Sequence, residues 1–203
     1  MMTTAKAVRH AIEAFPEGEA FTVKDLTQLG TRASVDQILY RMARDNEIIR
    51  VARGIYSRPK FNKYVKAPIL PDSYQVAKRI AETRGAKIGP TGASAANMLG
   101  LSTQMPTQPV YLTTGRTSDI QFGNSKIHFR HAAPKQMQYA GTAIGAAIAA
   151  VRYLGKKEFT FEVISKLEIR LKKDDFQALR QATTALPGWA MDKFYKYEKH
   201  HGR

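Results

Sequence analysis

The stretch from Thr22 to Ser57, TVKDLTQLGTRASVDQILYRMARDNEIIRVARGIYS, decides the fold of the N-terminal part of the chain. Its first residue is a suitable N-cap for a short helix over 23–28, and Gly30 is a suitable stop. Ser34 is a suitable cap for the next helix, which we expect to run to about residue 46. The apolar residues of that helix recur at the spacing of one helical face. They are Val35, Ile38, Leu39 and Met42.

Two short strands follow this helix and form a predicted hairpin. Residues 48–51 (IIRV) and 54–57 (GIYS) are rich in strand-forming side chains, and residues 52–54 join them with a glycine in the turn. An amphipathic helix over 5–15 precedes the whole stretch. The order helix, helix, tight turn, helix, hairpin predicts a winged helix-turn-helix, whose second motif helix enters the major groove of DNA.

The predicted helix over 34–46 carries a polar stripe on the face away from its apolar residues. The stripe consists of Ser34, Gln37, Arg41 and Arg44. Glutamine pairs with adenine and arginine with guanine through two hydrogen bonds each, so we expect the stripe to read bases. Arg32 at the helix start and Arg50 and Arg53 on the hairpin are expected to contact phosphates. A solvated helix face is the alternative, because any amphipathic helix shows such a stripe.

The charge of the chain is strongly basic and evenly spread. The 203 residues include 32 Lys and Arg against 17 Asp and Glu, a net charge of +15. Residues 1–66, 67–140 and 141–203 each carry a net charge of +5. A basic tail would concentrate the excess at one end, whereas an even spread favours folded surfaces that face a polyanion, most often nucleic acid. A basic composition without a specific partner is the alternative.

Proline density places a domain boundary near Lys66. Residues 58–73 contain three prolines and little periodicity, which predicts an extended linker between a domain over 1–66 and one over 67–203. The second domain has predicted helices over 73–84, 93–99, 140–154, 160–172, 175–185 and 189–199, and predicted strands over 110–113, 120–122 and 127–129. The fold class is therefore α+β: a winged helix-turn-helix followed by an α+β domain with a small sheet and C-terminal helices.

No motif of catalysis or metal binding stands out. The chain has no cysteine, which excludes disulfides, cysteine-ligated zinc and thiol catalysis. The glycines of Gly89–Gly92 are not followed by the Lys-Ser/Thr pair of a phosphate-binding loop. His128 and His131 would point to opposite faces of a strand. We expect a non-enzymatic protein without metal or cofactor, and without a membrane span or signal peptide, hence cytoplasmic.

The C-terminal helices mix basic and aromatic residues. Lysines at 193, 196 and 199 alternate with aromatic side chains at 189, 194, 195 and 197. This pattern is typical of a surface that stacks nucleic-acid bases. It also fits solvated helices with the aromatics in the core, or a docking face for an acidic protein.

Two blocks of the second half resemble a known family. The run Gly89–Pro106, GPTGASAANMLGLSTQMP, followed by VYLTTG over 110–115, resembles the central block of AbiEi-type antitoxins. The segments GIYSRP over 54–59 and RYLG over 152–155 are similar to that family as well, in the same order. The resemblance therefore extends over nearly the whole chain.

This resemblance implies a two-part function. It implies an N-terminal winged helix-turn-helix that represses its own promoter by binding inverted repeats in double-stranded DNA, which would place two copies on DNA. It also implies a C-terminal domain that counteracts an AbiEii-type nucleotidyltransferase toxin in bacterial phage-defence loci, without a stable complex. The alternatives are a protein-interaction module that neutralises the toxin by direct complex formation, a stand-alone transcriptional regulator, and, last, an enzyme acting on nucleic acid or on the toxin's modification.

Overall fold

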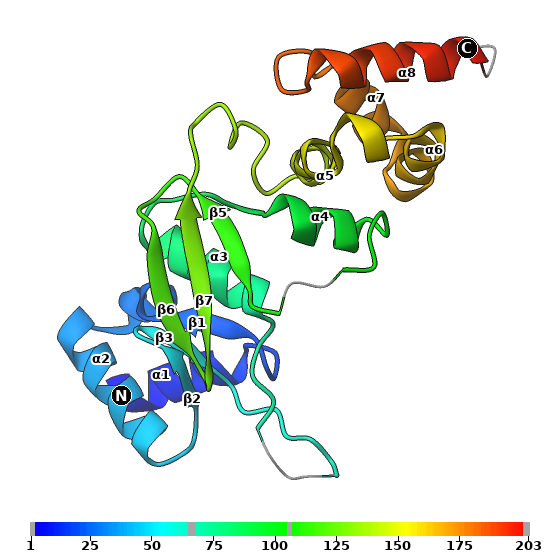
Figure 1. Cartoon of the computed structure of the whole chain (residues 1–203). Coiled ribbons are helices and arrows are strands. Elements are labelled where there is room, and N and C mark those ends of the chain that lie inside the picture. The colour runs from blue at the N-terminus through cyan, green and yellow to red at the C-terminus, as the bar shows by residue number, and fades with distance from the viewer. Residues whose placement is uncertain (1–2, 65–67, 105–106, 201–203) are drawn as a thin grey trace. The chain divides into compact units, whose positions relative to one another are not determined.

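The computed structural model describes residues 3–64, 68–104 and 107–200 (Figure 1). It is a mixed α+β fold, as the sequence predicts, and it contains two small sheets. Its contacts divide the chain into two compact units. The N-terminal unit comprises residues 1–85 and 119–127, and the C-terminal unit comprises residues 86–118 and 128–203. Each unit is described by itself.

The N-terminal unit contains the predicted helices and hairpin. The elements of its residues 1–85 are α1 (Thr4–Glu13), β1 (Ala20–Thr22), the 3₁₀ helix η1 (Val23–Leu29), α2 (Arg32–Arg44), β2 (Ile49–Ala52), β3 (Ile55–Ser57) and α3 (Ser73–Thr83). The sequence missed β1, which pairs antiparallel with β3 and makes the hairpin a three-stranded sheet of order β1-β3-β2. A strand of three residues is too short to show the alternation of apolar and polar side chains by which strands are recognised. Its pairing with β3 is therefore visible only in the structure.

The helix α2 is fixed by its cap and by its apolar face. Thr31, rather than the predicted Ser34, is the N-cap, and its hydroxyl accepts a 3.3 Å hydrogen bond from the amide of Ser34. Val35, Leu39 and Met42 are buried against α1, η1 and the sheet. Burial of three such side chains contributes roughly 1.5–3 kcal/mol each to the stability of the unit.

The helix α3 belongs to the N-terminal unit and not to the second domain. Lys66, where the boundary was expected, lies outside the described residues. The compact unit extends to Gly85, because α3 packs against β1 and β3 and Lys24 donates a 3.2 Å hydrogen bond from Nζ to the carbonyl oxygen of Thr83. Prolines mark where regular structure stops, but they do not say which neighbour the next helix packs against. The contacts divide the chain after Gly85, whereas the domain boundary near Lys66 stays a prediction from the sequence.

The second sheet is built on a parallel pair of strands. Its strands are β4 (Ile88–Pro90), β5 (Val110–Thr113), β6 (Ser118–Phe122) and β7 (Ser125–His131), in the order β4-β5-β7-β6. β5 runs parallel to β7 and antiparallel to β4. The sequence predicts β5, β6 and β7 but no strand over residues 88–90, where the structure has β4. The short helix α4 (Gly92–Met98) follows that strand directly.

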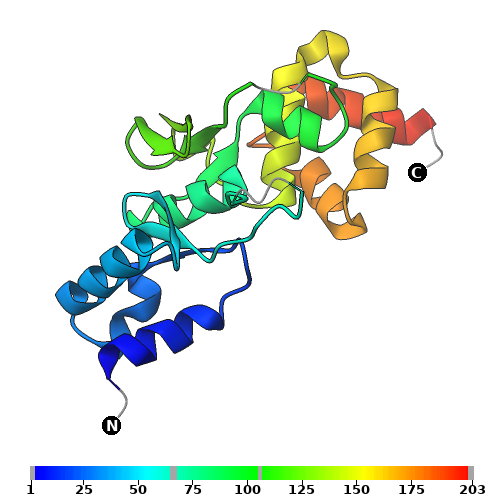
Figure 2. The same ribbon diagram turned by 90° about the horizontal axis from the view of Figure 1, so that it is seen from below.

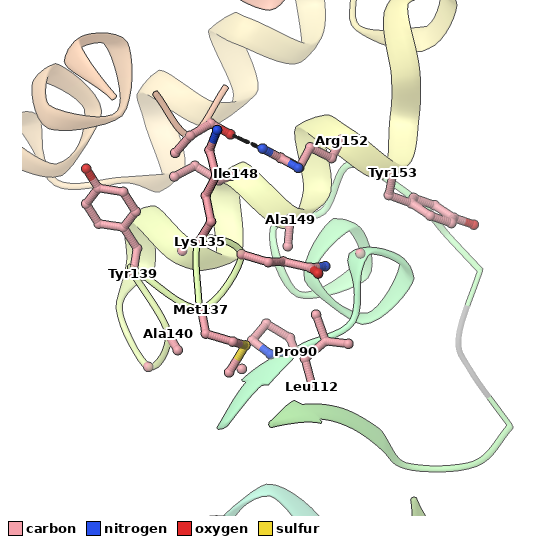
Figure 3. Close-up of a pocket in the computed structure, with 16 residues that line it drawn as sticks. Pro90, Leu112, Lys135, Met137, Tyr139, Ala140, Ile148, Ala149, Arg152 and Tyr153 are labelled. Atoms are coloured by element: carbon pink, nitrogen blue, oxygen red, sulfur yellow. Dashed lines mark hydrogen bonds between the residues drawn. The ribbon is translucent and has the colours of Figure 1, made fainter. Parts of the chain in front are cut away.

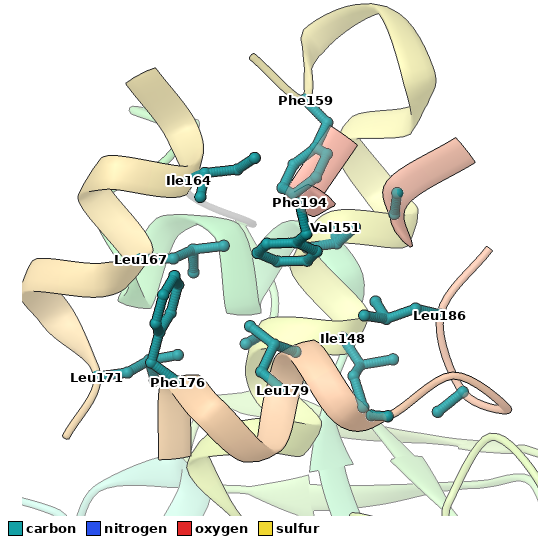
Figure 4. Close-up of a cluster of buried hydrophobic side chains, with 14 of the residues drawn as sticks. Ile148, Val151, Phe159, Ile164, Leu167, Leu171, Phe176, Leu179, Leu186 and Phe194 are labelled. Carbon is teal, nitrogen blue, oxygen red and sulfur yellow. The ribbon is translucent and has the colours of Figure 1, made fainter. Parts of the chain in front are cut away.

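Four helices form the main core of the C-terminal unit (Figures 2 and 4). They are α5 (Ala143–Glu158), α6 (Phe161–Arg170), α7 (Lys173–Gln181) and α8 (Gly188–His200). Phe159 and Phe194 meet edge to face with ring centroids 5.4 Å apart, and Leu167 is fully buried beside them. Within the residues the structure describes, no helix combines the length and hydropathy needed to cross a membrane.

The helices α4 and α5 approach closely through small residues. Ala95, Ala96 and Ala150 form a buried cluster between them. A Cβ on Gly92 would lie 2.5 Å from the Cβ of Tyr153. The small residues of α4 and α5 therefore serve core packing, because only a residue without a Cβ fits at position 92.

Candidate nucleic-acid interface

The outward face of α2 presents the polar stripe to solvent. Gln37, Arg41 and Arg44 are exposed on the side opposite the buried Val35 and Leu39. Arg44 Nε donates a 3.0 Å hydrogen bond to Asp45, and this contact raises the pKa of the guanidinium above its usual value. These three side chains therefore form a row that faces solvent. Of its two arginines, Arg44 is paired with a carboxylate of the protein and Arg41, within the residues that the structure describes, is not.

Tyr40 belongs to this face as well, although sequence reasoning did not select it. Its side chain is 62% exposed and lies three residues after Gln37, on the same side of α2. A phenol can bond a phosphate oxygen or contact a thymine methyl through its ring. An aromatic residue in a helix is usually assigned to the core. The one sequence signal that Tyr40 is exposed is that position 40 does not fit the spacing of the buried residues at 35, 39 and 42.

Ser34 is separated from the stripe by its own hydrogen bonds. Its hydroxyl donates a 2.8 Å hydrogen bond to the carbonyl oxygen of Thr31, and the residue is only half-exposed. A hydroxyl held in the first helical turn is occupied in capping. The structure thus places Ser34 with the helix cap and apart from Gln37 and the arginines.

Arg32, Arg50 and Arg53 line one hollow at the start of α2. Arg32 projects from the first turn of the helix, 3.8 Å from Asp36 and 80% exposed. Arg53 occupies the turn between β2 and β3, next to Gly54, whose φ of +75° is the left-handed conformation that glycine tolerates. The structure therefore brings together three arginines, of which the first and the last are 21 positions apart in the sequence.

Three arginines of this interface lack internal partners. Within residues 3–64, 68–104 and 107–200, the side chains of Arg41, Arg50 and Arg53 make no hydrogen bond or ion pair with the protein. Exposed cations without a neighbouring carboxylate are available to an external anion at no cost in broken contacts. They are the strongest candidates for ligand contact in this unit.

The C-terminal helices do not form a base-stacking surface. Phe194 and Tyr197 are buried, and Trp189 is partly buried against the core of this unit. Only Tyr195, at 68%, is exposed among the four aromatics. Across the described part of the chain, no group of three or more His, Asp or Glu side chains is arranged to hold a metal ion.

The model of a family of unknown function, DUF6088, matches residues 7–179. The chain belongs to DUF6088. The matched range begins in α1 and ends in α7, so the DUF6088 pattern includes the interface described above. No curated protein matches the chain. The comparison with solved structures finds the crystal structure of the RV2827C protein from Mycobacterium tuberculosis, with 14% identity, a TM-score of 0.45, and coverage of 90% of this chain and 73% of that chain.

Proposed function

We propose that the N-terminal unit is a winged helix-turn-helix that binds double-stranded DNA. The element order α1, β1, η1, α2, β2, β3 supports this, since η1 and α2 are separated by a turn of two residues, Gly30 and Thr31, and the β2–β3 hairpin follows. The observation that carries the proposal is the row of exposed cations on α2 and the hairpin, three of them without a partner in the described residues.

In this proposal the two groups of side chains have different roles. Gln37, Arg41 and Arg44 read base edges in the major groove, where each bidentate pair contributes about 1–3 kcal/mol of discrimination. Arg32, Arg50 and Arg53 hold phosphates and fix the register of α2 on the duplex. Ser34 is hydrogen-bonded to the N-cap residue Thr31 and so helps to hold the start of α2.

We further propose that the whole chain is an antitoxin that represses its own promoter. The likeness of residues 89–115 to AbiEi-type antitoxins supports this role. The partners would then be promoter DNA carrying an inverted repeat, bound by two copies, and an AbiEii-type nucleotidyltransferase toxin. Binding without catalysis accounts for both roles.

Two experiments test these statements separately. Gel shifts compare the chain's own upstream region with random duplex DNA over about 0.05–0.2 M salt, where phosphate contacts make affinity fall steeply. We expect tighter binding to the upstream region, and equal affinity for both duplexes would contradict promoter recognition. Co-expression with an AbiEii-type toxin is expected to restore growth, and unchanged toxicity would contradict the antitoxin role.

A second candidate function is direct binding of the toxin through exposed apolar side chains. Ile169 is 79% exposed on α6, and Met98 is exposed on α4. Exposed apolar residues of this size are typical of protein contact sites when they gather in a patch. Co-purification with the toxin that survives about 0.5 M salt, where exposed charge pairs are screened, would favour this mode. Recovery of each protein alone would favour neutralisation without a complex.

A further inference from the structure

The C-terminal unit contains a cavity of about 290 Å³ that the proposed function does not use (Figure 3). Its walls are β4, the segment over 135–141 and the inner face of α5. Sites for small ligands begin at about 300 Å³, so the volume suits a small molecule and excludes a folded peptide.

The charge of this cavity is one-sided. Its sixteen lining residues, all in the described part of the chain, include the cations Lys135 and Arg152 and no Asp or Glu. Arg152 uses Nε and Nη2 for hydrogen bonds of 3.0 and 2.6 Å to the carbonyl oxygen of Ala185. That carbonyl carries no net charge, and Lys135 makes no hydrogen bond or ion pair within the described residues. Two cations therefore share one cavity without a counter-ion from the protein.

The opposite end of the cavity is apolar. In Figure 3 the side chain of Lys135 extends towards the end where Arg152 lies, while Pro90, Leu112 and Met137 lie at the other end. A ligand that fits both ends has a charged group and an apolar body. Burial of the body and charge-assisted hydrogen bonds to its head would then act together.

Two glycines allow the close backbone contacts that shape this cavity before any ligand binds. A Cβ on Gly145 would collide with the carbonyl oxygen of Tyr139, so the wall over 139–141 rests directly on α5. Gly92 also brings α4 close to the same helix, because a Cβ there would lie 2.5 Å from the Cβ of Tyr153 and 3.0 Å from the backbone oxygen of Ala149. A site formed by such close packing needs little reordering on binding.

We infer that this cavity binds a small organic anion, with its carboxylate or phosphate at Lys135 and Arg152 and its apolar body against Pro90, Leu112 and Met137. The inference concerns the C-terminal unit alone and does not depend on DNA binding. Carboxylates and phosphates both present anionic oxygens to the two cations. The experiment below therefore uses one probe of each kind to tell the two ligand classes apart.

Calorimetric titration of the full chain tests this site. The probes are phenyl phosphate for the phosphate source and indole-3-acetate for the carboxylate source, each against its uncharged counterpart, phenol or indole-3-acetamide, and against inorganic phosphate. We expect one anionic probe to bind about tenfold or more tightly than its uncharged counterpart, and more tightly than inorganic phosphate. Binding by none of the organic probes, or equal binding of a probe and its counterpart, would overturn the inference. So would inorganic phosphate binding as tightly as the best organic probe.

Three variants assign the binding to the cavity. Lys135→Ala removes one cation, and Gln136→Glu adds an acid to the lining with almost no change in shape. Both should weaken the anionic probe about tenfold, because both alter the charge that meets its head. Lys157→Ala removes an exposed cation of α5 outside the lining and should leave the affinity unchanged. Equal affinity in Lys135→Ala and Lys157→Ala would place the ligand elsewhere and overturn the inference.

Discussion

Arg79 of α3 donates a 3.1 Å hydrogen bond from Nε to the carbonyl oxygen of Ala20 in β1. The same guanidinium lies 3.7 Å from Glu19, 3.8 Å from Asp25 and 3.6 Å from Glu82. One cation thus joins α3 to the N-terminal sheet and lies within 3.8 Å of three carboxylates. This contact explains why the compact unit continues past the proline-rich segment to Gly85.

Arg79→Met should destabilise the protein by about 1–3 kcal/mol, since it removes a charge-assisted hydrogen bond and leaves three carboxylates close together. The side chain is 29% exposed, so solvent screens only part of this effect. Urea unfolding at neutral pH measures the change. Lys78→Met on the same helix removes an equal charge from an exposed position and should have little effect. Equal losses in the two variants would mean that only net charge matters.

The pair between Arg9 and Glu47 should make stability depend on pH. Arg9 donates two 2.9 Å hydrogen bonds to the Glu47 carboxylate, and these hold the pKa of Glu47 below its usual value. A carboxyl group with a lowered folded-state pKa stabilises the fold above its unfolded pKa of about 4.3 and loses this effect as pH falls through the folded pKa.

Glu47→Gln is therefore expected to lower the Tm slightly at neutral pH. Because both groups are largely exposed, the effect is small and decreases at high salt. Thermal unfolding of both proteins over a series from neutral to acidic pH should show their Tm values converging as the carboxylate is protonated. A constant difference across the series would show that the amide acts through packing and not through charge.

Gly92→Ala should destabilise the C-terminal unit by about 1–3 kcal/mol through overpacking. The added Cβ would lie 3.0 Å from the backbone oxygen of Ala149, in addition to its clash with Tyr153. Gly188→Ala at the start of α8 is the matched control, because no atom lies within 4 Å of its Cβ position. The control should be neutral or slightly stabilising, since alanine favours a helix. Equal thermal stability of the two variants would show that α4 can shift.

Arg41→Ala and Arg53→Ala should weaken DNA binding in different ways if the proposed interface is correct. Arg41→Ala is expected to cost about 1–3 kcal/mol and to relax the preference at one base pair. Arg53→Ala should weaken binding to all sequences and reduce the salt slope by about one unit. Gel shifts on upstream and random duplexes separate the two effects. An equal loss on both duplexes for Arg41→Ala would argue against base reading by this residue.

Tyr40→Ala is expected to weaken DNA binding several-fold without loss of stability. Its ring lies on the outward face of α2 and is exposed, so truncation creates no cavity. Tyr40→Phe separates the two possible contacts, because it keeps the ring and removes only the hydroxyl. Full affinity in Tyr40→Phe would assign the contact to the ring. Unchanged affinity in Tyr40→Ala would remove this residue from the interface.

The sequence by itself determined the elements whose signals are local. The apolar spacing of Val35, Leu39 and Met42 defines the core face of α2, and therefore also its outward face with Gln37 and Arg41. The turn at Gly54 likewise needs a residue that tolerates positive φ, which is visible in the amino-acid type alone. Such signals act over one helical turn or one hairpin, so no distant partner is needed to read them.

Only the tertiary structure decided which distant segments meet. The pairing of β1 with β3, the parallel alignment of β5 with β7 and the packing of α3 on the first sheet each join residues far apart in the chain. The cavity beside Lys135 and Arg152 likewise exists only because separate segments converge on α5. These arrangements depend on long-range burial and shape complementarity, which periodicity within a single segment does not encode.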